Sequence, residues 1–304
     1  VWEIVGGSPL NGNGFFSERR ILVPFMGEGY ACMAARESGS TTRYNLPVPI
    51  YRGAMMEQVT RDTRTWFADW ANEYDTTLGK VQRHHALLDL VVSLSGVRDG
   101  DQVLDIGCGT GLLSLTFLER ADCTITAVDS SDEMLRIFRE KIATCDLSGR
   151  IHCEALSAEE MDFHADQFDI IASTVALHHV KEKAPVIEKI YDALNEGGRF
   201  VLGDMDLDTT GNRDDPRRLE RILAFLTREC VLAREGGGIS AFERMYDNGK
   251  KHIFNDGEYC IGFDQWMALC TDAGFRQGEV TPVQGFEWFK VLVARKEGGC
   301  GSLR

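Results

Sequence analysis

Two aspartates and three closely spaced glycines are the residues of this chain whose types and spacing most clearly point to chemistry. Gly107, Gly109 and Gly111 alternate with single residues, and Asp105 lies two positions before the first of them. Glycine lets the backbone turn tightly and approach a ligand, and the free N–H groups at the start of a following helix attract anions. Asp129 ends the next predicted strand, where a carboxylate can accept both hydroxyls of a ribose. These residues therefore predict a site for an adenosyl ligand.

The elements that position these residues follow from hydrophobic periodicity. Residues 102–106 read as a short buried strand, and leucines then recur at helical spacing from Leu112 to Leu118. The period thus changes from strand to helix across the glycines, as it does at the opening of a βαβ unit. A G-x-G-x-G match by itself is weak, because nicotinamide and flavin folds use similar turns.

The same patterns predict an alternation of strands and helices along most of the chain. Asp204 and Asp206 should emerge from the end of the fifth strand, and the histidines at 84 and 85 should lie near the solvated start of a helix. Strands are expected at 102–106, 124–128, 151–155, 167–173, 199–203, 277–283 and 287–294, and helices at 56–74, 84–94, 112–118, 131–142, 185–196 (with Gly197-Gly198 at its C-cap), 219–230 and 263–270.

The segments 105–111 and 127–131 resemble the class I S-adenosylmethionine (SAM)-dependent methyltransferases. Within that class they are similar to the small-molecule branch typified by ubiquinone/menaquinone-biosynthesis enzymes. The resemblance covers roughly residues 66–296 and is weakest between Asp206 and Tyr259. It implies an α/β, Rossmann-like fold with a seven-stranded, mostly parallel sheet whose last strand is antiparallel, and helices on both faces.

The resemblance also implies a domain organisation. Residues 51–296 would form the methyltransferase domain, with a substrate lid inserted at about 208–262 or, alternatively, an insertion of purely structural role. Residues 1–50 would be an N-terminal extension, and 297–304 a tail. The aromatic helix ahead of the core would cover the cofactor; Trp66, Phe67 and Trp70 fit ordinary packing, whereas Tyr74 fits either packing or function.

By the same resemblance, SAM is the expected cofactor. Asp105 would fix the methionine amino group directly or through water, Thr174 would offer it a carbonyl, and Met134 would lie beneath the adenine. Ser157 stands where most members carry an aspartate before the Ala-Glu pair that borders the adenine. The expected cofactor-binding residues are Asp105, Gly107, Cys108, Gly109, Asp129, Ser130, Met134, Ala158, Glu159 and Thr174.

Methyl transfer from a sulfonium is an in-line displacement whose thioether leaving group needs no proton. The protein has to bind SAM, align a nucleophile and exclude water. If the acceptor must lose a proton, the candidate bases are His178, His179, Asp204 and Tyr246. His179 could instead orient the backbone, and Asp204 could be a solvated acid at a strand end.

Composition limits the partners. The formal net charge of −14 argues against nucleic acid and anionic membranes, and no apolar run is long enough to span a bilayer. The nine cysteines form no C-x-x-C pair, so we expect neither a metal site nor a disulfide framework, but a soluble, cytoplasmic protein.

The predicted function is methyl transfer to a small-molecule acceptor, with the acceptor and the oligomeric state left open. A non-catalytic SAM-binding module would carry the same cofactor residues. A methyltransferase acting on a protein or a nucleic acid is the other alternative. Base-amino methyltransferases commonly carry an N/D-P-P-Y/F loop after the fourth strand, whereas residues 174–177 contain neither proline nor an aromatic residue.

Overall fold

The computed structural model describes residues 71–76, 81–212, 214–252 and 259–297, without the side chains of residues 248, 251 and 252. All of these residues belong to one compact unit, which begins at Gln58. The predictions made for residues 1–50, for Trp66, Phe67 and Trp70, and for the tail after residue 297 lie outside the described part.

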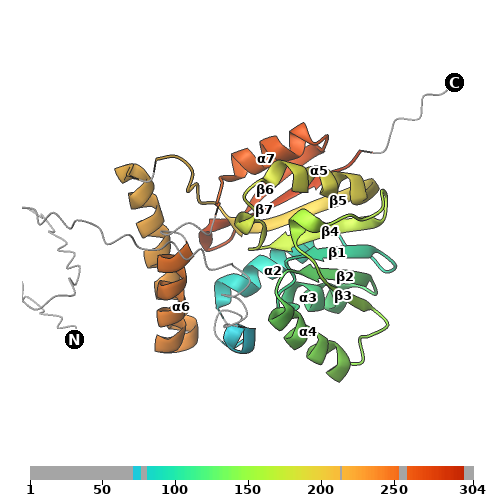
Figure 1. The fold of residues 1–304 in the computed structure, drawn as a ribbon, viewed down its shortest axis with the longest axis horizontal. Helices are drawn as coiled ribbons and strands as arrows, with labels where there is room; N and C mark the ends of the chain where they lie inside the picture. Colours follow the sequence, from blue (N-terminus) through green and yellow to red (C-terminus); the bar gives the residue numbers. More distant parts are fainter. Residues whose placement is uncertain (1–70, 77–80, 213, 253–258, 298–304) are drawn as a thin grey trace, which may run out of the picture. The chain divides into compact units, whose positions relative to one another are not determined.

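A single seven-stranded sheet forms the centre of this unit (Figure 1), with strand order β3-β2-β1-β4-β5-β7-β6. The first five strands run parallel, and β7 runs antiparallel to both of its neighbours. This arrangement confirms the predicted Rossmann-like sheet. The strands are β1 (Gln102–Ile106), β2 (Thr124–Asp129), β3 (Ile151–Ala155), β4 (Phe168–Thr174), β5 (Leu194–Met205), β6 (Arg276–Val283) and β7 (Phe286–Arg295).

Helices cover both faces of the sheet. On one face α2, α3, α4 and the first half of α6 share a core with the strands, and on the other face α5 and α7 do so. Two 3₁₀ turns, η2 and η3, follow β3 and β4. The helices are α2 (Gln82–Ser95), α3 (Leu112–Arg120), α4 (Asp132–Thr144), α5 (Lys183–Ala193), α6 (Pro216–His252) and α7 (Phe263–Asp272), and the turns are η2 (Ala158–Glu160) and η3 (Leu177–His179).

Strand β1 illustrates how the sequence builds this core. Val103, Leu104 and Ile106 are all buried, because a central parallel strand is covered on both faces and reads as a continuous apolar run. Val103 packs with α2 and α3, and its neighbour Leu104 packs with α5. Asp105 shares the face of Val103, so this acid is carried into the protein interior beneath the glycine turn.

The end of α5 differs from the prediction. The helix stops at Ala193 rather than at the Gly197-Gly198 pair, and β5 begins at Leu194. Leu194 has extended dihedral angles (φ −76°, ψ 140°) and pairs with Phe168 of β4. The prediction failed because a buried leucine at this position satisfies the helical and the strand pattern equally well.

The start of α2 also differs. His84 is only 4% exposed, so it does not lie at a solvated helix start, although His85 is exposed as predicted. Burial and, to a smaller extent, the charge of the neighbouring Arg83 lower the pKa of His84 to about 3. His84 is therefore a neutral core residue, and its ring meets that of Tyr74 edge-on.

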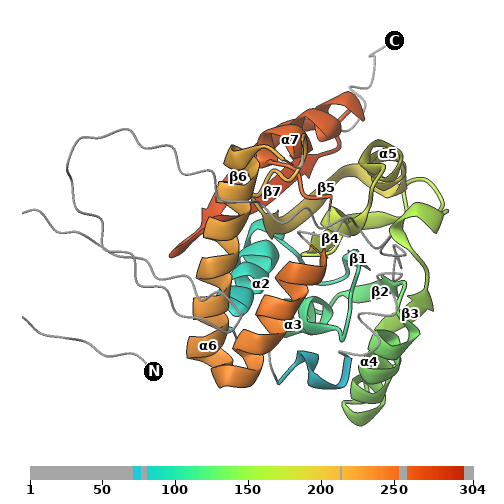
Figure 2. The ribbon, with the colours of Figure 1, turned by 60° about the vertical axis from the view of Figure 1, so that its left-hand side comes forward.

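Helix α6 is two helices joined at a kink. Gly238 has non-helical dihedral angles (φ 72°, ψ −158°), so the helix breaks within the glycine triplet at residues 236–238. Figure 2 shows the two halves lying side by side. Cys230 and Ala233 of the first half, Ala241 and Met245 of the second, and Val81 before α2 form a small apolar cluster. The second half continues to His252, beyond the helix at 219–230 that the sequence predicts.

Candidate active site

A cleft of about 440 Å³ opens at the carboxyl ends of β1, β2, β3 and β4. Ligands of open α/β sheets bind at this edge, and the volume lies within the range of small-molecule pockets. The cleft is lined by Tyr74, Ile106, Gly107, Gly109, Asp129, Ser130, Met134, Leu156, Ser157, Ala158, Glu159, Glu160, Thr174, Val175, Ala176, Leu177, His179 and Val180.

Most of the residues selected from the sequence meet in this cleft. Nine of them contribute to its wall: Gly107, Gly109, Asp129, Ser130, Met134, Ala158, Glu159, Thr174 and His179. Five do not: Asp105, Cys108, His178, Asp204 and Tyr246. The first four of these five lie buried in the protein, and Tyr246 lies on its surface.

Asp129 is held in a fixed orientation at the cleft wall. The backbone N–H of Gly109 donates to its Oδ2, and that of Ser131 donates to its Oδ1, each at 2.8 Å. Burial raises the pKa of Asp129, and these two hydrogen bonds act in the opposite direction. Because a carboxylate accepts about four hydrogen bonds, capacity remains for a ligand's hydroxyl groups.

The glycine turn and the end of β4 approach each other closely. Gly107 has φ 71°, and a Cβ atom there would overlap the methyl group of Ala176, so only glycine fits both the conformation and the space. Val175 has φ 45°, a strained conformation for a β-branched residue, and its N–H donates to the carbonyl of Gly203 at 2.9 Å. Backbone strain of this kind is typical of functional sites.

Asp105 lies behind the glycine turn rather than in the cleft wall. Its side chain is 1% exposed, and the hydroxyl of Ser114 donates to its Oδ2 at 2.6 Å. Among the described residues its Oδ1 has no hydrogen-bond partner. Burial raises the pKa of Asp105 to about 7 and that of the adjacent Cys108 thiol well above its usual value.

A short segment from the N-terminal side, residues 71–76, contacts the glycine turn. Thr110 donates from Oγ1 to Asp75 Oδ1 at 2.6 Å, and Lys141 pairs with Asp75 Oδ2 at 2.5 Å. Lys141 also donates to the carbonyl of Thr110 at 2.8 Å. Tyr74 thereby lines the cleft, and burial raises its pKa to about 12, so the phenol stays neutral.

The sequence did not assign roles to Asp75, Thr110 or Lys141. The only signals present were the place of Thr110 inside the glycine turn and that of Asp75 beside Tyr74. Lys141 is one of several lysines and arginines on α4, and nothing local distinguishes it.

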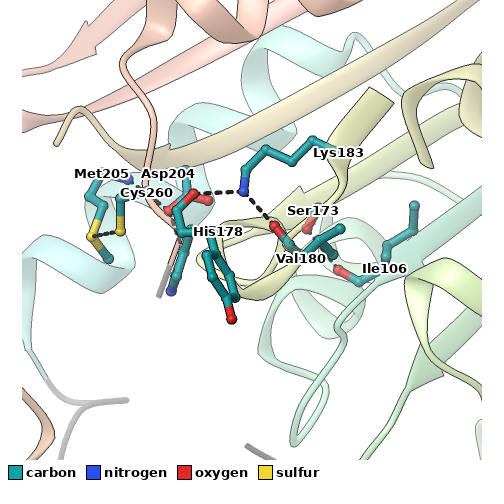
Figure 3. Close-up of polar contacts among 9 residues, drawn as sticks. Ile106, Ser173, His178, Val180, Lys183, Asp204, Met205 and Cys260 are labelled. Carbon is teal, nitrogen blue, oxygen red and sulfur yellow. Dashed lines mark hydrogen bonds and ion pairs between the residues drawn. The ribbon is translucent and has the colours of Figure 1, made fainter. Parts of the chain in front are cut away.

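His178 and Asp204 form a buried pair just behind the cleft (Figure 3). Their Nδ1 and Oδ1 atoms lie 2.8 Å apart, and the N–H of Met205 also donates to that oxygen at 2.8 Å. The ring of His178 lies 4.1 Å from that of His179, which lines the cleft. Asp204 is fully buried within β5, so the alternative of a solvated acid at the strand end is wrong.

Lys183 is a buried cation beside the pair of His178 and Asp204, and it was not among the residues predicted from the sequence. Its Nζ donates to the carbonyls of Val180 (2.5 Å) and Tyr259 (2.6 Å) and lies 5.5 Å from the centre of the Trp266 ring. Burial lowers its pKa. Because the N–H of Tyr259 donates to the carbonyl of His178 at 2.8 Å, these contacts hold the chain that returns from α6 against η3.

Tyr246 lies away from the cleft. It is 56% exposed on the second half of α6, and its ring stacks on that of Phe242. In the part of the chain that the structure describes, no three His, Cys, Asp or Glu residues are grouped so as to hold a metal ion. Over the same residues, no helix is both long and apolar enough to cross a membrane.

Comparisons with known proteins agree with this geometry. Residues 103–198 match a family model described as "Methyltransferase domain". A ubiquinone/menaquinone biosynthesis C-methyltransferase UbiE from Marinomonas sp. is 34% identical over 36% of this chain and 45% of its own length. A 27-O-demethylrifamycin SV methyltransferase from Amycolatopsis mediterranei is 28% identical over 45% of this chain and 51% of its own. The chain thus spans about half the length of these curated relatives.

Solved structures share the fold. Phosphoethanolamine N-methyltransferase 2 from Haemonchus contortus, in complex with SAM, aligns with a TM-score of 0.52 at 15% identity, over 76% of this chain and 60% of that one. The sheet and the family match together define a class I SAM-dependent methyltransferase domain. Within that class, the domain resembles the UbiE-type C-methyltransferases.

Proposed function

We propose that this protein transfers a methyl group from SAM to a small-molecule acceptor. The observation that carries the proposal is Asp129, fixed by two backbone N–H groups in the wall of a cleft that is also lined by Gly107 and Thr174. The match of residues 103–198 to a methyltransferase domain supports the same conclusion.

The order of strands agrees with the order of groups in SAM. Along the sheet edge the cleft runs from Thr174 of β4, past Gly107 after β1 and Asp129 of β2, to residues 156–160 after β3. The methionine part would lie at β4 and β1, the ribose at Asp129, and the adenine at 156–160. The carboxyl oxygen of Asp105 that lacks a partner fits a site for the methionine amino group, reached directly or through water.

When bound, SAM supplies an electrophilic methyl group on a sulfonium. The residues of this chain would orient the two reactants and exclude water, and Tyr74 and Val175 are among those that line the cleft. For an acceptor that must lose a proton, His179 is the candidate base that lines the cleft. His178 is buried behind it, with its Nδ1 atom 2.8 Å from Asp204 Oδ1, and would position the ring of His179.

Two observations favour a small-molecule acceptor over the alternatives. The net charge of −14 opposes binding to nucleic acid. The names of the two relatives refer to quinone biosynthesis and to a rifamycin. Turnover distinguishes an enzyme from a non-catalytic SAM-binding protein. The cytoplasmic location stays a prediction.

We retain the lid as part of the proposal, but restrict it to the second half of α6. The first half buries Ile222, Phe225 and Leu226 in the sheet core and is therefore structural. The second half, from Ile239 onward, contacts the segment that carries Tyr74, since Arg244 pairs with Glu73 at 2.6 Å. Tyr246 and His252 fall in this half, so a role for them would concern the acceptor rather than SAM.

Calorimetric titration with SAM tests the cofactor assignment. Asp129→Ala should weaken binding at least tenfold, about 1.4 kcal/mol, because charge-assisted hydrogen bonds to the ribose are lost. Asp132→Ala is the matched control, since Asp132 is exposed and lies outside the cleft. Unchanged affinity in a folded Asp129→Ala protein would overturn the ribose assignment.

Turnover tests the activity itself. The protein is incubated with methyl-labelled SAM and a metabolite extract, and the methylated product is identified by mass spectrometry. The proposal predicts label in a small molecule and formation of S-adenosylhomocysteine. Tight SAM binding without transfer to any acceptor would favour the non-catalytic alternative, and label in protein or nucleic acid would overturn the small-molecule acceptor.

A further inference from the structure

Lys183 is the first residue of α5 and a buried cation that lies outside the cleft wall. Its side chain is 6% exposed, and among the described residues no carboxylate forms an ion pair with it. Its ammonium group instead meets two main-chain carbonyls, that of Val180 at 2.5 Å and that of Tyr259 at 2.6 Å. Burying a charge is costly unless it is well hydrogen-bonded, so these two bonds have to offset its desolvation. An apolar side chain in the same place would avoid that cost but could make neither bond.

The two carbonyls belong to segments that are far apart in the sequence. Val180 closes η3, and Tyr259 lies in the chain that returns from α6 toward α7. The N–H of Tyr259 donates to the carbonyl of His178 in η3 at 2.8 Å, so both polar main-chain groups of Tyr259 are held. Figure 3 shows Lys183 reaching the carbonyl of Val180 beside the pair of His178 and Asp204. The ammonium group therefore links α5, η3 and the return chain at one point.

The turn η3 depends on contacts of this kind for its position. It is three residues long, and no side chain caps its start. A 3₁₀ turn of this length makes few hydrogen bonds of its own, so its place is set by the groups that surround it. His179 in this turn and Val180 after it both line the cleft. A contact that fixes η3 therefore also fixes the imidazole that is the candidate base.

We propose that Lys183 is a positioning residue, which links η3 to the return chain through the carbonyls of Val180 and Tyr259 and thereby holds His179 in the cleft wall. The inference rests on the proposed function, because that function gives His179 its role. A lysine suits this task, since its ammonium group carries three donors on a flexible stem and can reach the carbonyls of two segments at once. Methionine has a side chain of similar length but no donor, so Lys183→Met removes the link and little else.

Hydrogen exchange of the full chain tests the link directly. In Lys183→Met the amides of Val180 and Tyr259 should exchange about tenfold faster or more, because the hydrogen bonds that hold the two segments together are lost. Amides of β1 report global unfolding and should exchange as in the wild type. Lys181→Met is the matched control, since Lys181 is exposed and two positions away, and it should change neither region. Unchanged exchange in Lys183→Met, or an equal increase in β1, would overturn the proposal.

Binding and transfer separate positioning from a purely structural role. By calorimetric titration, Lys183→Met should bind S-adenosylhomocysteine within about threefold of the wild type, because Lys183 lies outside the cleft wall. At saturating SAM, its rate of methyl transfer to the acceptors of a metabolite extract should fall by about tenfold or more, because a displaced η3 misaligns the reacting groups. A parental rate, or a loss of affinity as large as the loss of rate, would overturn the positioning role.

If Lys183→Met does not fold, exchange in the wild type decides alone. The amides of His179, Val180 and Tyr259 should then open as one unit, with protection factors that agree within about threefold. Unrelated protection factors would overturn the link. A wild-type protein that binds no S-adenosylhomocysteine would refute the proposed function, whereas the exchange experiment needs no ligand, so the two failures are distinguishable.

Discussion

The two halves of α6 are attached to the rest of the protein in different ways. The first half places Ile222, Phe225 and Leu226 in the sheet core, and its Glu229 forms a buried ion pair with Arg83 of α2 at 2.7 Å. The second half is held by a small apolar cluster and by the surface pair of Arg244 and Glu73. The insertion therefore combines a structural half with a loosely attached one.

The largest effect should come from breaking the ion pair of the first half. The side chains of Arg83 and Glu229 are 6% and 3% exposed, and the guanidinium lies 4.2 Å from the centre of the Phe289 ring. Glu229→Ala leaves the arginine buried without a counter-charge, and this should lower the free energy of unfolding by about 3–5 kcal/mol. Urea denaturation measures the change.

The control in the same half is Glu235→Ala, an exposed glutamate whose loss should change stability by less than about 0.5 kcal/mol. The double variant Arg83→Met, Glu229→Leu should recover most of the lost stability, because it removes both charges together. A Glu229→Ala protein as stable as the wild type would mean that the first half is no more firmly attached than the second.

Asp105 is a second buried acid and sharpens the comparison because, unlike Glu229, it has no cation beside it among the described residues. Burial raises the pKa of Asp105 from 3.8 to about 7, so the folded protein keeps its proton while the unfolded chain releases it. The ligand-free protein should therefore lose about 2–4 kcal/mol of stability from this group as the pH rises from 4 to 7, with little further loss above 7.

Asp105→Asn should remove that part of the pH dependence, which urea denaturation at pH 5 and pH 8 measures. Asp132→Asn, an exposed aspartate on α4, should follow the wild type. SAM would favour the ionised form through its amino group, so binding near pH 7 should release protons in the wild type but not in Asp105→Asn. Parallel pH profiles for the wild type and Asp105→Asn would contradict the raised pKa.

The kink between the two halves gives a smaller effect. Gly238 has φ 72° and ψ −158°, a region that only glycine occupies readily, so Gly238→Ala should cost about 1–3 kcal/mol. Gly236→Ala is the control, since Gly236 is helical, exposed and without a positive φ, and alanine there should be neutral or stabilising. Equal effects of the two substitutions would show that the kink is not a fixed feature.

How far the sequence predicted these features depends on the range of the interactions. The strand patterns, the glycine turn and Asp129 were predictable because the period of hydrophobic residues and the turn residues are local signals. The Arg83–Glu229 pair joins residues 146 positions apart, and the His178–Asp204 pair is made only when β4 and β5 lie side by side. No local signal distinguishes Glu229 from the exposed glutamates of the same helix.

The same reasoning applies to the cleft wall after β3. The segment 157–160 was located by its resemblance, but the direction of each side chain from the 3₁₀ turn is not a local signal. Side-chain direction follows from the backbone path, which the residue types alone did not define. The end of α5 was wrong for a related reason, since Leu194 suits a helix and a strand equally.

The smallest expected effect on stability, and the most direct test of the comparison, comes from Arg244→Ala. The pair with Glu73 is 2.6 Å long, but the two side chains are 31% and 56% exposed, so its loss should cost less than about 1 kcal/mol of global stability. Its local effect should be larger, because the second half would then be held mainly by Ala241 and Met245. Hydrogen exchange should therefore become faster for the amides of residues 239–250 and stay unchanged for 219–235.

Half-molar salt should reproduce this change in the wild type, since it screens a surface ion pair but hardly affects a buried one. Arg234→Ala removes an exposed arginine of the first half and should change neither region. If Arg244→Ala instead lowers global stability by more than about 2 kcal/mol, the second half is part of the core and cannot act as a lid. If exchange rises equally in both halves, α6 moves as one body, and the kink at Gly238 does not separate a fixed half from a mobile one.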